Sequence, residues 1–474
     1  MSSLVIRSSR DVIDFVNSHP TGSRRGRFVA MLVLGSIFID AYDFTSLAIG
    51  VKTLQTQLGL SSFELGNVTA FMAFGALAGA FAGGYLVDRL GRFKLLILDL
   101  ILFVVAALGA AFAPNLAVLL VFRFLLGAGV GVDMPAALSF VTEFSRTQDK
   151  GKYVNFWQLL WYVATVCSAA IALPFYFAGA GNNLWRWAVG FGAVPALVIL
   201  VLRFLYADES PMWAAHHQGL EAAAAILRRN YQVEATVERE STRGAARVLV
   251  TEIFRSPYRA RTVLASALSG LQAMEYYAVG FYLPVIIALI FGKGILYVVL
   301  GTIVINVFGL LGGGTQPFLT RRLGVWKLAV IGCVIAAAAL ILVGTLQSTI
   351  PAYLGALLVG IFIFGHSFGP GSQGKTMAAL SYPTQFRGVG TGWAEAMSRV
   401  GSILGFYVFP LVLAVAGLSH TLLYLAAIPL LALAALLSIH WEPVGQDVEN
   451  GGEAILDGRP TTGVAAAAPA PRIS

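Results

Sequence analysis

Charged residues are scarce in this chain. Only 12% of its 474 residues are Asp, Glu, Lys or Arg, whereas a soluble domain has about 25%. The chain has just two cysteines, Cys167 and Cys333, and both lie inside apolar stretches, so neither indicates a disulfide or a redox motif. The six histidines are scattered, and the pattern HExxH is absent. We therefore expect no enzymatic activity, no metal site and no cofactor.

Long apolar stretches are what the sequence has instead, since 57% of the residues are hydrophobic. A helix needs about 20 apolar residues to cross a bilayer, and such stretches recur along the chain. Because these stretches are continuous and do not alternate with polar residues, they exclude a transmembrane β-barrel. The sequence predicts an all-α integral membrane protein with about twelve transmembrane helices.

A polar stretch divides the predicted helices into six and six. The expected units are a cytoplasmic N-terminal segment (1–27), an N-terminal six-helix bundle (28–206), a cytoplasmic central loop (207–260), a C-terminal six-helix bundle (261–440) and a cytoplasmic tail (441–474). The tail is rich in small residues and proline and has no periodic apolar face, so we expect it to be disordered.

Basic residues give the expected orientation. The formal net charge is +8, and the positive residues gather on alternate loops, for example at Arg25, Arg89 and Arg146. This is the positive-inside pattern, which predicts a multi-pass protein of the cell membrane with both termini in the cytoplasm. The basic residues therefore indicate membrane topology and no nucleic-acid partner.

Two segments of the first half recur in the second half. The sequence ALSFVTEFSRTQDKGKY (137–153) is echoed by ALSYPTQFRGVGTGW (379–393), and the RLG at 89–91 is echoed by the RLG at 322–324. Matching loops in two six-helix halves are typical of parallel-repeat transporters, whose substrate site lies at the interface of the halves near the membrane midplane.

Several motifs resemble those of the major facilitator superfamily. The stretch GGYLVDRLGR (83–92) resembles its loop 2–3 signature, and RFLLGAGVGVDMPAALSFVTEF (123–144) resembles its helix 4 pattern. DESPMW (208–213) resembles a motif of the sugar porters and their metabolite-transporting relatives. RGVGTGWAEAMSRVGSILGFYVFP (387–410) resembles helix 11 of the metabolite:H⁺ and aromatic-acid:H⁺ symporters. The resemblance implies two six-helix bundles around a central cavity, working by alternating access.

The resemblance also implies a cytoplasmic gate. We expect Asp88 to face the positive N-terminal end of a neighbouring helix, and Arg89 and Arg92 to pair with Glu143. The alternative is that the basic residues only determine topology. The predicted gate residues are Gly84, Asp88, Arg89, Gly91, Arg92, Glu143 and Arg387.

Ionisable residues inside predicted membrane helices are candidates for proton coupling, because placing them there is costly. Asp40 and Asp43 are the leading pair, since residues three apart share one face of a helix. Asp133 is about 15 Å along its helix from Arg123, too far to pair with it directly. The rival role for each is a structural ion pair. The predicted proton-coupling residues are Asp40, Asp43, Asp133 and Glu275.

Aromatic and polar residues of the predicted helices are candidates for binding substrate. Pro370 predicts a break in its helix, which would let neighbouring side chains reach the cavity. Arg399 can hold an anion bidentately, or it can pair with Glu395 four residues earlier. The predicted substrate-binding residues are Tyr42, Trp161, Gln272, Tyr276, Tyr277, His366, Gln373 and Arg399.

These features favour a proton symporter for a small organic solute. We expect an organic acid or related metabolite, because cationic residues reach the cavity and the paired Gln and Asn that sugar porters carry on helix 7 are missing. The alternatives are a sugar or polyol transporter, or a uniporter that ignores the proton gradient. The expected partners are the solute, protons and the lipid bilayer, and we expect the chain to act as a monomer. A P-loop pattern, GPGSQGKT (369–376), follows an apolar stretch and predicts no nucleotide site.

Overall fold

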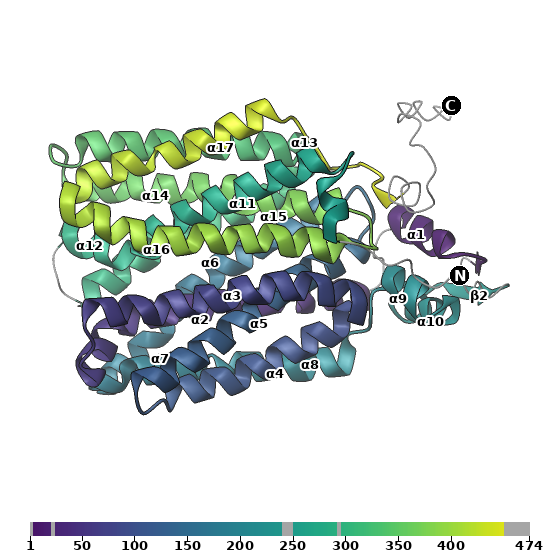
Figure 1. Cartoon of the computed structure of the whole chain (residues 1–474), viewed down its shortest axis with the longest axis horizontal. Coiled ribbons are helices and arrows are strands. Elements are labelled where there is room, and N and C mark those ends of the chain that lie inside the picture. Colours follow the sequence, from purple (N-terminus) through teal and green to yellow (C-terminus); the bar gives the residue numbers. More distant parts are fainter. Residues whose placement is uncertain (1–2, 20–23, 239–249, 292–294, 450–474) are drawn as a thin grey trace.

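The computed structural model of the chain describes residues 3–19, 24–238, 250–291 and 295–449. Figure 1 shows two groups of long helices lying side by side, α2–α8 and α11–α17, with a smaller group of elements beyond one end of them. Ten segments are long and apolar enough to cross a membrane, and two of these contain two crossings each, so the predicted twelve transmembrane helices in two sets of six are confirmed.

The N-terminal bundle contains six crossings. Its elements are α2 (Arg24–Leu58), α3 (Ser62–Leu90), α4 (Arg92–Ala111), α5 (Leu116–Glu143), α6 (Lys150–Phe177), the short 3₁₀ helix η1 (Gly181–Asn183), α7 (Leu184–Phe191) and α8 (Ala193–Tyr206). The hairpin between α3 and α4 turns at Gly91, whose φ of 104° is readily adopted only by glycine.

The C-terminal bundle repeats this arrangement. Its elements are α11 (Arg259–Val279), α12 (Leu283–Phe291), α13 (Ile295–Leu346), α14 (Ala352–Phe368), α15 (Pro370–Ser381), α16 (Arg387–Leu425) and α17 (Ala427–Ser438). The helices α13 and α16 each turn sharply at one glycine, Gly324 with φ 77° and Gly417 with φ 71°. The predicted break at Pro370 is present, because α14 ends at Phe368 and α15 begins at Pro370.

A small module on one end of the bundles corrects two of the predicted units. The strand β1 (Ser3–Ile6) pairs in parallel with β2 (Glu234–Val237), and three helices join them: α1 (Ser9–Ser18), α9 (Pro211–His217) and α10 (Leu220–Tyr231). Ile6, Val12, Leu220 and Leu227 are buried in its core. The N-terminal segment and the central loop therefore fold together, and the fold is not purely helical. Each strand has only four residues, and its partner lies more than 200 positions away in the sequence. No local sequence pattern therefore predicts that the two strands pair. The central loop ends with a 3₁₀ helix, η2 (Val250–Phe254).

The predicted disordered tail is partly folded. Residues 441–449 follow α17 back to the bundles, and Val448 and Glu449 are both buried. Glu449 is held by an ion pair with Arg387, which explains why a segment of polar composition is ordered. The remainder of the predicted tail, 450–474, lies outside the described residues.

Candidate transport site and cytoplasmic gate

Asp88 joins the two bundles as the sequence predicts. Its carboxylate accepts hydrogen bonds from the backbone N–H groups of Gly388 at 3.0 Å and Val389 at 2.8 Å. These groups begin α16, where the unsatisfied N–H groups and the helix dipole favour a negative charge. A carboxylate at the end of α3 thus caps a helix of the opposite bundle.

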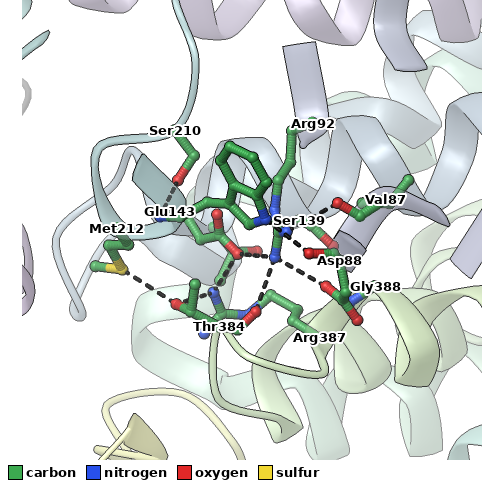
Figure 2. Close-up of polar contacts among 12 residues, drawn as sticks. Val87, Asp88, Arg92, Ser139, Glu143, Ser210, Met212, Thr384, Arg387 and Gly388 are labelled. Atoms are coloured by element: carbon green, nitrogen blue, oxygen red, sulfur yellow. Dashed lines mark hydrogen bonds and ion pairs between the residues drawn. The ribbon is translucent and has the colours of Figure 1, made fainter. Parts of the chain in front are cut away.

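Arg92 links Asp88 to further groups of both bundles (Figure 2). One of its guanidinium nitrogens, Nη2, donates to Asp88 at 3.0 Å, to Glu143 at 2.7 Å and to the carbonyl oxygen of Thr384 at 2.8 Å. Glu143 also accepts a hydrogen bond from Arg387 at 3.0 Å. The network is buried and contains groups of both bundles, so it holds the bundles together at this end of the molecule.

Glycines allow the backbones to meet at this gate. The helices α3 and α16 cross where Gly84 and Gly392 face each other, and a Cβ on Gly392 would lie 2.6 Å from the Cα of Gly84. A Cβ on Gly84 would lie 2.7 Å from the carbonyl oxygen of Gly388. No side chain fits between these helices while the gate is closed.

Arg89 is a correction to the predicted gate. It is exposed, and its guanidinium contacts the Tyr85 hydroxyl at 3.3 Å. Because Arg89 lies next to Asp88 on a helix, its side chain points about 100° away from the gate. Only Arg92 of the two arginines pairs with Glu143.

Two further acidic residues complete the gate. Glu209, which follows α8, accepts hydrogen bonds from the backbone N–H groups of Arg92 at 3.0 Å and Phe93 at 3.2 Å, and so caps α4. Burial raises the pKa of Glu209 to about 7. Burial acts in the same direction on Glu449, but the positive charges of Arg387 and Lys150 outweigh it and hold the pKa of Glu449 below its usual range. The first of these acids lies in the DESPMW motif, whereas nothing in the sequence around Glu449 indicated a role.

A small cavity of about 20 Å³ lies between the bundles in this conformation. It is lined by residues of α6 from the N-terminal bundle and of α11, α14, α15 and α16 from the C-terminal bundle. These are Trp157, Gln158, Trp161, Gln272, Tyr276, Tyr277, His366, Lys375 and Ser398. Five of the predicted substrate-binding residues are among them. Gln158 was missed, although it lies three residues before Trp161 and therefore on the same face of α6.

The cavity wall is mostly aromatic. The indole N–H of Trp161 donates to the Tyr276 hydroxyl at 3.0 Å, across the boundary between the bundles. The ring of Tyr276 stacks on His366 and meets Tyr277 edge-on, with ring centroids 5.4 Å and 5.3 Å away. Such rings offer flat apolar faces, while the amides of Gln158 and Gln272 offer hydrogen bonds.

Both cations near the cavity are paired with one carboxylate. Lys375 Nζ lies 2.8 Å from Glu395, and Arg399 Nε donates to the same carboxylate at 2.7 Å. Arg399 also donates to the Tyr277 hydroxyl at 3.1 Å. The alternative noted for Arg399, pairing with Glu395, is therefore the arrangement found. Nearby, His366 Nδ1 lies 3.5 Å from Glu275.

Asp40 and Asp43 have different surroundings despite their spacing. Asp43 forms a buried ion pair with Arg123 of α5 at 2.9 Å. Among the residues that the structure describes, Asp40 has no ion pair, and its Oδ2 has no hydrogen-bond partner. Asp133 accepts a hydrogen bond from the Ser36 hydroxyl at 2.6 Å, inside the N-terminal bundle.

Two predicted substrate-binding residues lie away from the cavity. The Tyr42 hydroxyl donates to the carbonyl oxygen of Ala188 at 2.8 Å, so this side chain holds α2 against α7 within one bundle. Gln373 is buried between the bundles, where its amide N–H donates to Gln316 at 2.5 Å. Both placements depend on how each helix is rotated about its own axis relative to its neighbours. Composition does not reveal that rotation.

Comparison with known proteins agrees with this architecture. The glucose transporter GlcP of Staphylococcus epidermidis is 26% identical over 433 residues, covering 89% of this chain and 95% of that protein. The inner membrane metabolite transport protein YgcS of Escherichia coli is 27% identical over 400 residues, covering 84% and 88%. The proton:xylose symporter XylE of E. coli, solved with bound 6-bromo-6-deoxy-D-glucose, superposes with a TM-score of 0.78 at 19% identity, covering 91% of this chain and 99% of XylE.

The family of sugar (and other) transporters matches residues 28–449, which include both bundles and the ordered part of the tail. The relatives and the shared fold are those of membrane transporters and not of enzymes. This multi-pass membrane protein, whose fold is that of the major facilitator superfamily symporter XylE, therefore belongs to the family of sugar (and other) transporters.

Proposed function

We propose that this protein is a proton-coupled symporter of a sugar or a sugar-like metabolite. The observation that carries the proposal is the cavity between the bundles, where tryptophan and tyrosine rings alternate with the side-chain amides of Gln158 and Gln272. Ring faces pack against the C–H faces of a sugar, and amides bond its hydroxyl groups in both directions. Relatives named for glucose and xylose transport support the same substrate class.

An organic acid, which the sequence favoured, is not confirmed. That prediction depended on free cations at the cavity, but Glu395 binds both Lys375 and Arg399. An anionic substrate would have to compete with a carboxylate that is already in place. The alternative prediction, a sugar or polyol, agrees better with the cavity and with the relatives.

Proton coupling is proposed to involve the carboxylates of α2. Asp43 and Arg123 form a buried pair that joins α2 to α5. Protonation of Asp43 would leave Arg123 as an uncompensated buried charge, which is unfavourable by several kcal/mol, about 3–5 in comparable cases. A proton that arrives at this pair therefore favours another helix arrangement, as symport requires. A uniporter does not need a proton-sensitive ion pair, so the pair of Asp43 and Arg123 favours a symporter over a uniporter.

The membrane orientation is part of the same proposal. The gate of Asp88, Arg92 and Glu143 lies at the end of the bundles that carries the small module and both ordered chain ends. The positive-inside distribution supports a cytoplasmic location for this end. The present conformation is then closed to the cytoplasm, and the chain is proposed to work in this way as a monomer.

Uptake into liposomes tests the proposal. The purified protein is reconstituted, and labelled glucose, xylose, galactose and small carboxylates are offered with and without an inward proton gradient. We expect a sugar to accumulate above its external concentration only with the gradient. Accumulation of a carboxylate instead would restore the organic-acid alternative. Sugar equilibration that ignores the gradient would show a uniporter, and the coupling proposal would be wrong.

A further inference from the structure

The N-terminal bundle contains a second group of buried charges that the mechanism above does not use. Asp99 of α4 is 5% exposed, Asp133 of α5 is 1% exposed, and Arg203 of α8 is fully buried. Three helices thus bring two carboxyl groups and one guanidinium to a single point. Of these three residues, only Asp133 was predicted from the sequence.

The guanidinium of Arg203 donates its hydrogen bonds to neutral groups. It donates to the carbonyl oxygen of Leu96 at 2.6 Å and to the carbonyl oxygen of Val33 and hydroxyl of Ser36, both at 2.5 Å. Its nitrogens lie 3.8 Å from Asp99 and 3.7 Å from Asp133, beyond hydrogen-bond distance. One positive charge is therefore shared by two acids and forms a close pair with neither.

Both carboxyl groups lie within 4 Å of the same guanidinium, and each has an oxygen, Oδ1, with no hydrogen-bond partner in the described part of the chain. Two like charges gathered around one buried guanidinium cannot both remain ionised. Charge balance gives the same answer, since one guanidinium neutralises one carboxylate and burying a second, unpaired charge is very unfavourable.

We infer that Asp99 and Asp133 form a proton-binding site that holds one shared proton beside Arg203. The Ser36 hydroxyl fixes its geometry by donating to Asp133 at 2.6 Å. This site differs from the pair of Asp43 and Arg123, which has one charge of each sign and binds no proton in its paired form. That this proton takes part in coupling, together with the pair of Asp43 and Arg123, rests on the proposed symport, whereas the shared proton itself does not.

Asp40 of α2 is a further buried carboxyl group of the same bundle. It is 2% exposed, and its Oδ2 has no hydrogen-bond partner in the described part of the chain. The helix α2 packs against α5 and α8, which carry Asp133 and Arg203.

Infrared spectroscopy tests the shared proton without any transport. The purified protein in nanodiscs at pH 7.5 should show the carbonyl absorption of protonated carboxylic acids. Asp99→Asn and Asp133→Asn should each remove one component of this absorption in the wild-type-minus-variant difference spectrum, because the remaining carboxylate then pairs with Arg203. Asp43→Asn is the matched control, since it removes a buried but ionised carboxylate and should give no such difference band. If neither Asp99→Asn nor Asp133→Asn loses a carbonyl component, the inference is wrong.

Ser36→Ala supplies a variant that keeps every charge. It removes the hydroxyl that donates to Asp133, so the band should shift in frequency, and an unchanged frequency would also overturn the inference.

Transport measurements separate the two proposals. Asp99→Asn should lose gradient-driven accumulation at least tenfold while retaining substrate exchange between equal concentrations on both sides, which needs no net proton movement. Full accumulation in Asp99→Asn would exclude this site from coupling. A wild-type protein that ignores the gradient would instead overturn the proposed symport, and the infrared result would still decide whether the proton is shared.

Discussion

Single carboxylates hold the gate through contacts with several partners at once. Asp88 illustrates this, because it is bound by Arg92 within its own bundle and by two backbone N–H groups of the other. Residues of this kind set the balance between conformations more than they set the stability of either bundle.

Replacing Asp88 should shift that balance. Asp88→Asn removes the charge that caps α16, and a hydrogen bond to a charged group contributes about 1.5–3 kcal/mol. We expect the closed state to lose at least about tenfold in population. The measurement is the labelling rate of Ser398→Cys, in a background without the two native cysteines, by a thiol reagent applied from the cytoplasmic side. Asp149→Asn is the control, because Asp149 pairs only with Arg146 of its own loop. Equal rates in wild type and Asp88→Asn would contradict the gate assignment.

Glu209 should make stability depend on pH. Its pKa rises from 4.5 to about 7 in the folded protein because of burial. The folded state then binds this proton more tightly than the unfolded state, so the contribution to stability is complete below pH 4.5 and is lost as the pH rises through about 7. The loss is at most about 3 kcal/mol. Melting temperatures in detergent should fall from pH 5 to pH 8, and Glu209→Gln should flatten this fall. An equally steep fall in the variant would show that other groups cause it.

Whole helices meet at the gate through glycine. The crossing of α3 and α16 brings backbone against backbone, with Gly84 opposite Gly392. Close packing of this kind is sensitive to one added methyl group, because neither backbone can move without moving its helix.

Gly392→Ala should open this crossing. The added Cβ would lie 2.6 Å from Gly84 Cα and 2.7 Å from the carbonyl oxygen of Ala80, so α3 and α16 must separate. We expect faster cytoplasmic labelling of Ser398→Cys and slower transport, with the bundles themselves still folded. Gly355→Ala in α14 is the matched control, since no atom lies within 4 Å of its added Cβ. Normal transport by Gly392→Ala would mean that the helices do not need this contact.

Across the whole molecule, one chain of ion pairs connects the tail to both bundles. Glu449 of the tail pairs with Arg387 of the C-terminal bundle, Arg387 pairs with Glu143 of the N-terminal bundle, and Glu143 pairs with Arg92. Glu449 also accepts hydrogen bonds from the backbone N–H of Thr384 at 2.9 Å and from its hydroxyl at 3.1 Å.

Two truncations test whether the tail stabilises the closed gate. Removing residues 446–474 deletes Glu449, one of the carboxylates that pair with Arg387. Because this weakens the closed gate, we expect faster cytoplasmic labelling of Ser398→Cys. Removing residues 450–474 keeps Glu449 and should leave the rate unchanged. Glu449→Gln in the full chain should reproduce the first truncation. The same rate in all four proteins would show that the tail does not act on the gate.

Much of this organisation was predictable from local signals. Apolar stretches predict the crossings, the charge bias predicts topology, and the repeat predicts two matching halves. The meeting of Asp88, Arg92 and Glu143 was predictable because all three stand in motifs. The placements of Arg89 and Tyr42 were not, since the direction of a side chain from its helix depends on how that helix is rotated against its neighbours.

The sequence by itself determined the fold class, the number of crossings and the chemistry available in the membrane, because hydrophobicity and charge act residue by residue. The tertiary structure decided which of those charges meet. Asp40 and Asp43 are three residues apart, yet Asp43 pairs with Arg123, whereas the Oδ2 of Asp40 has no hydrogen-bond partner in the described part of the chain. Asp99, Asp133 and Arg203 are far apart in the chain and meet only because α4, α5 and α8 pack together. Burial then gives these contacts their strength, since the interaction between charges grows as water is excluded.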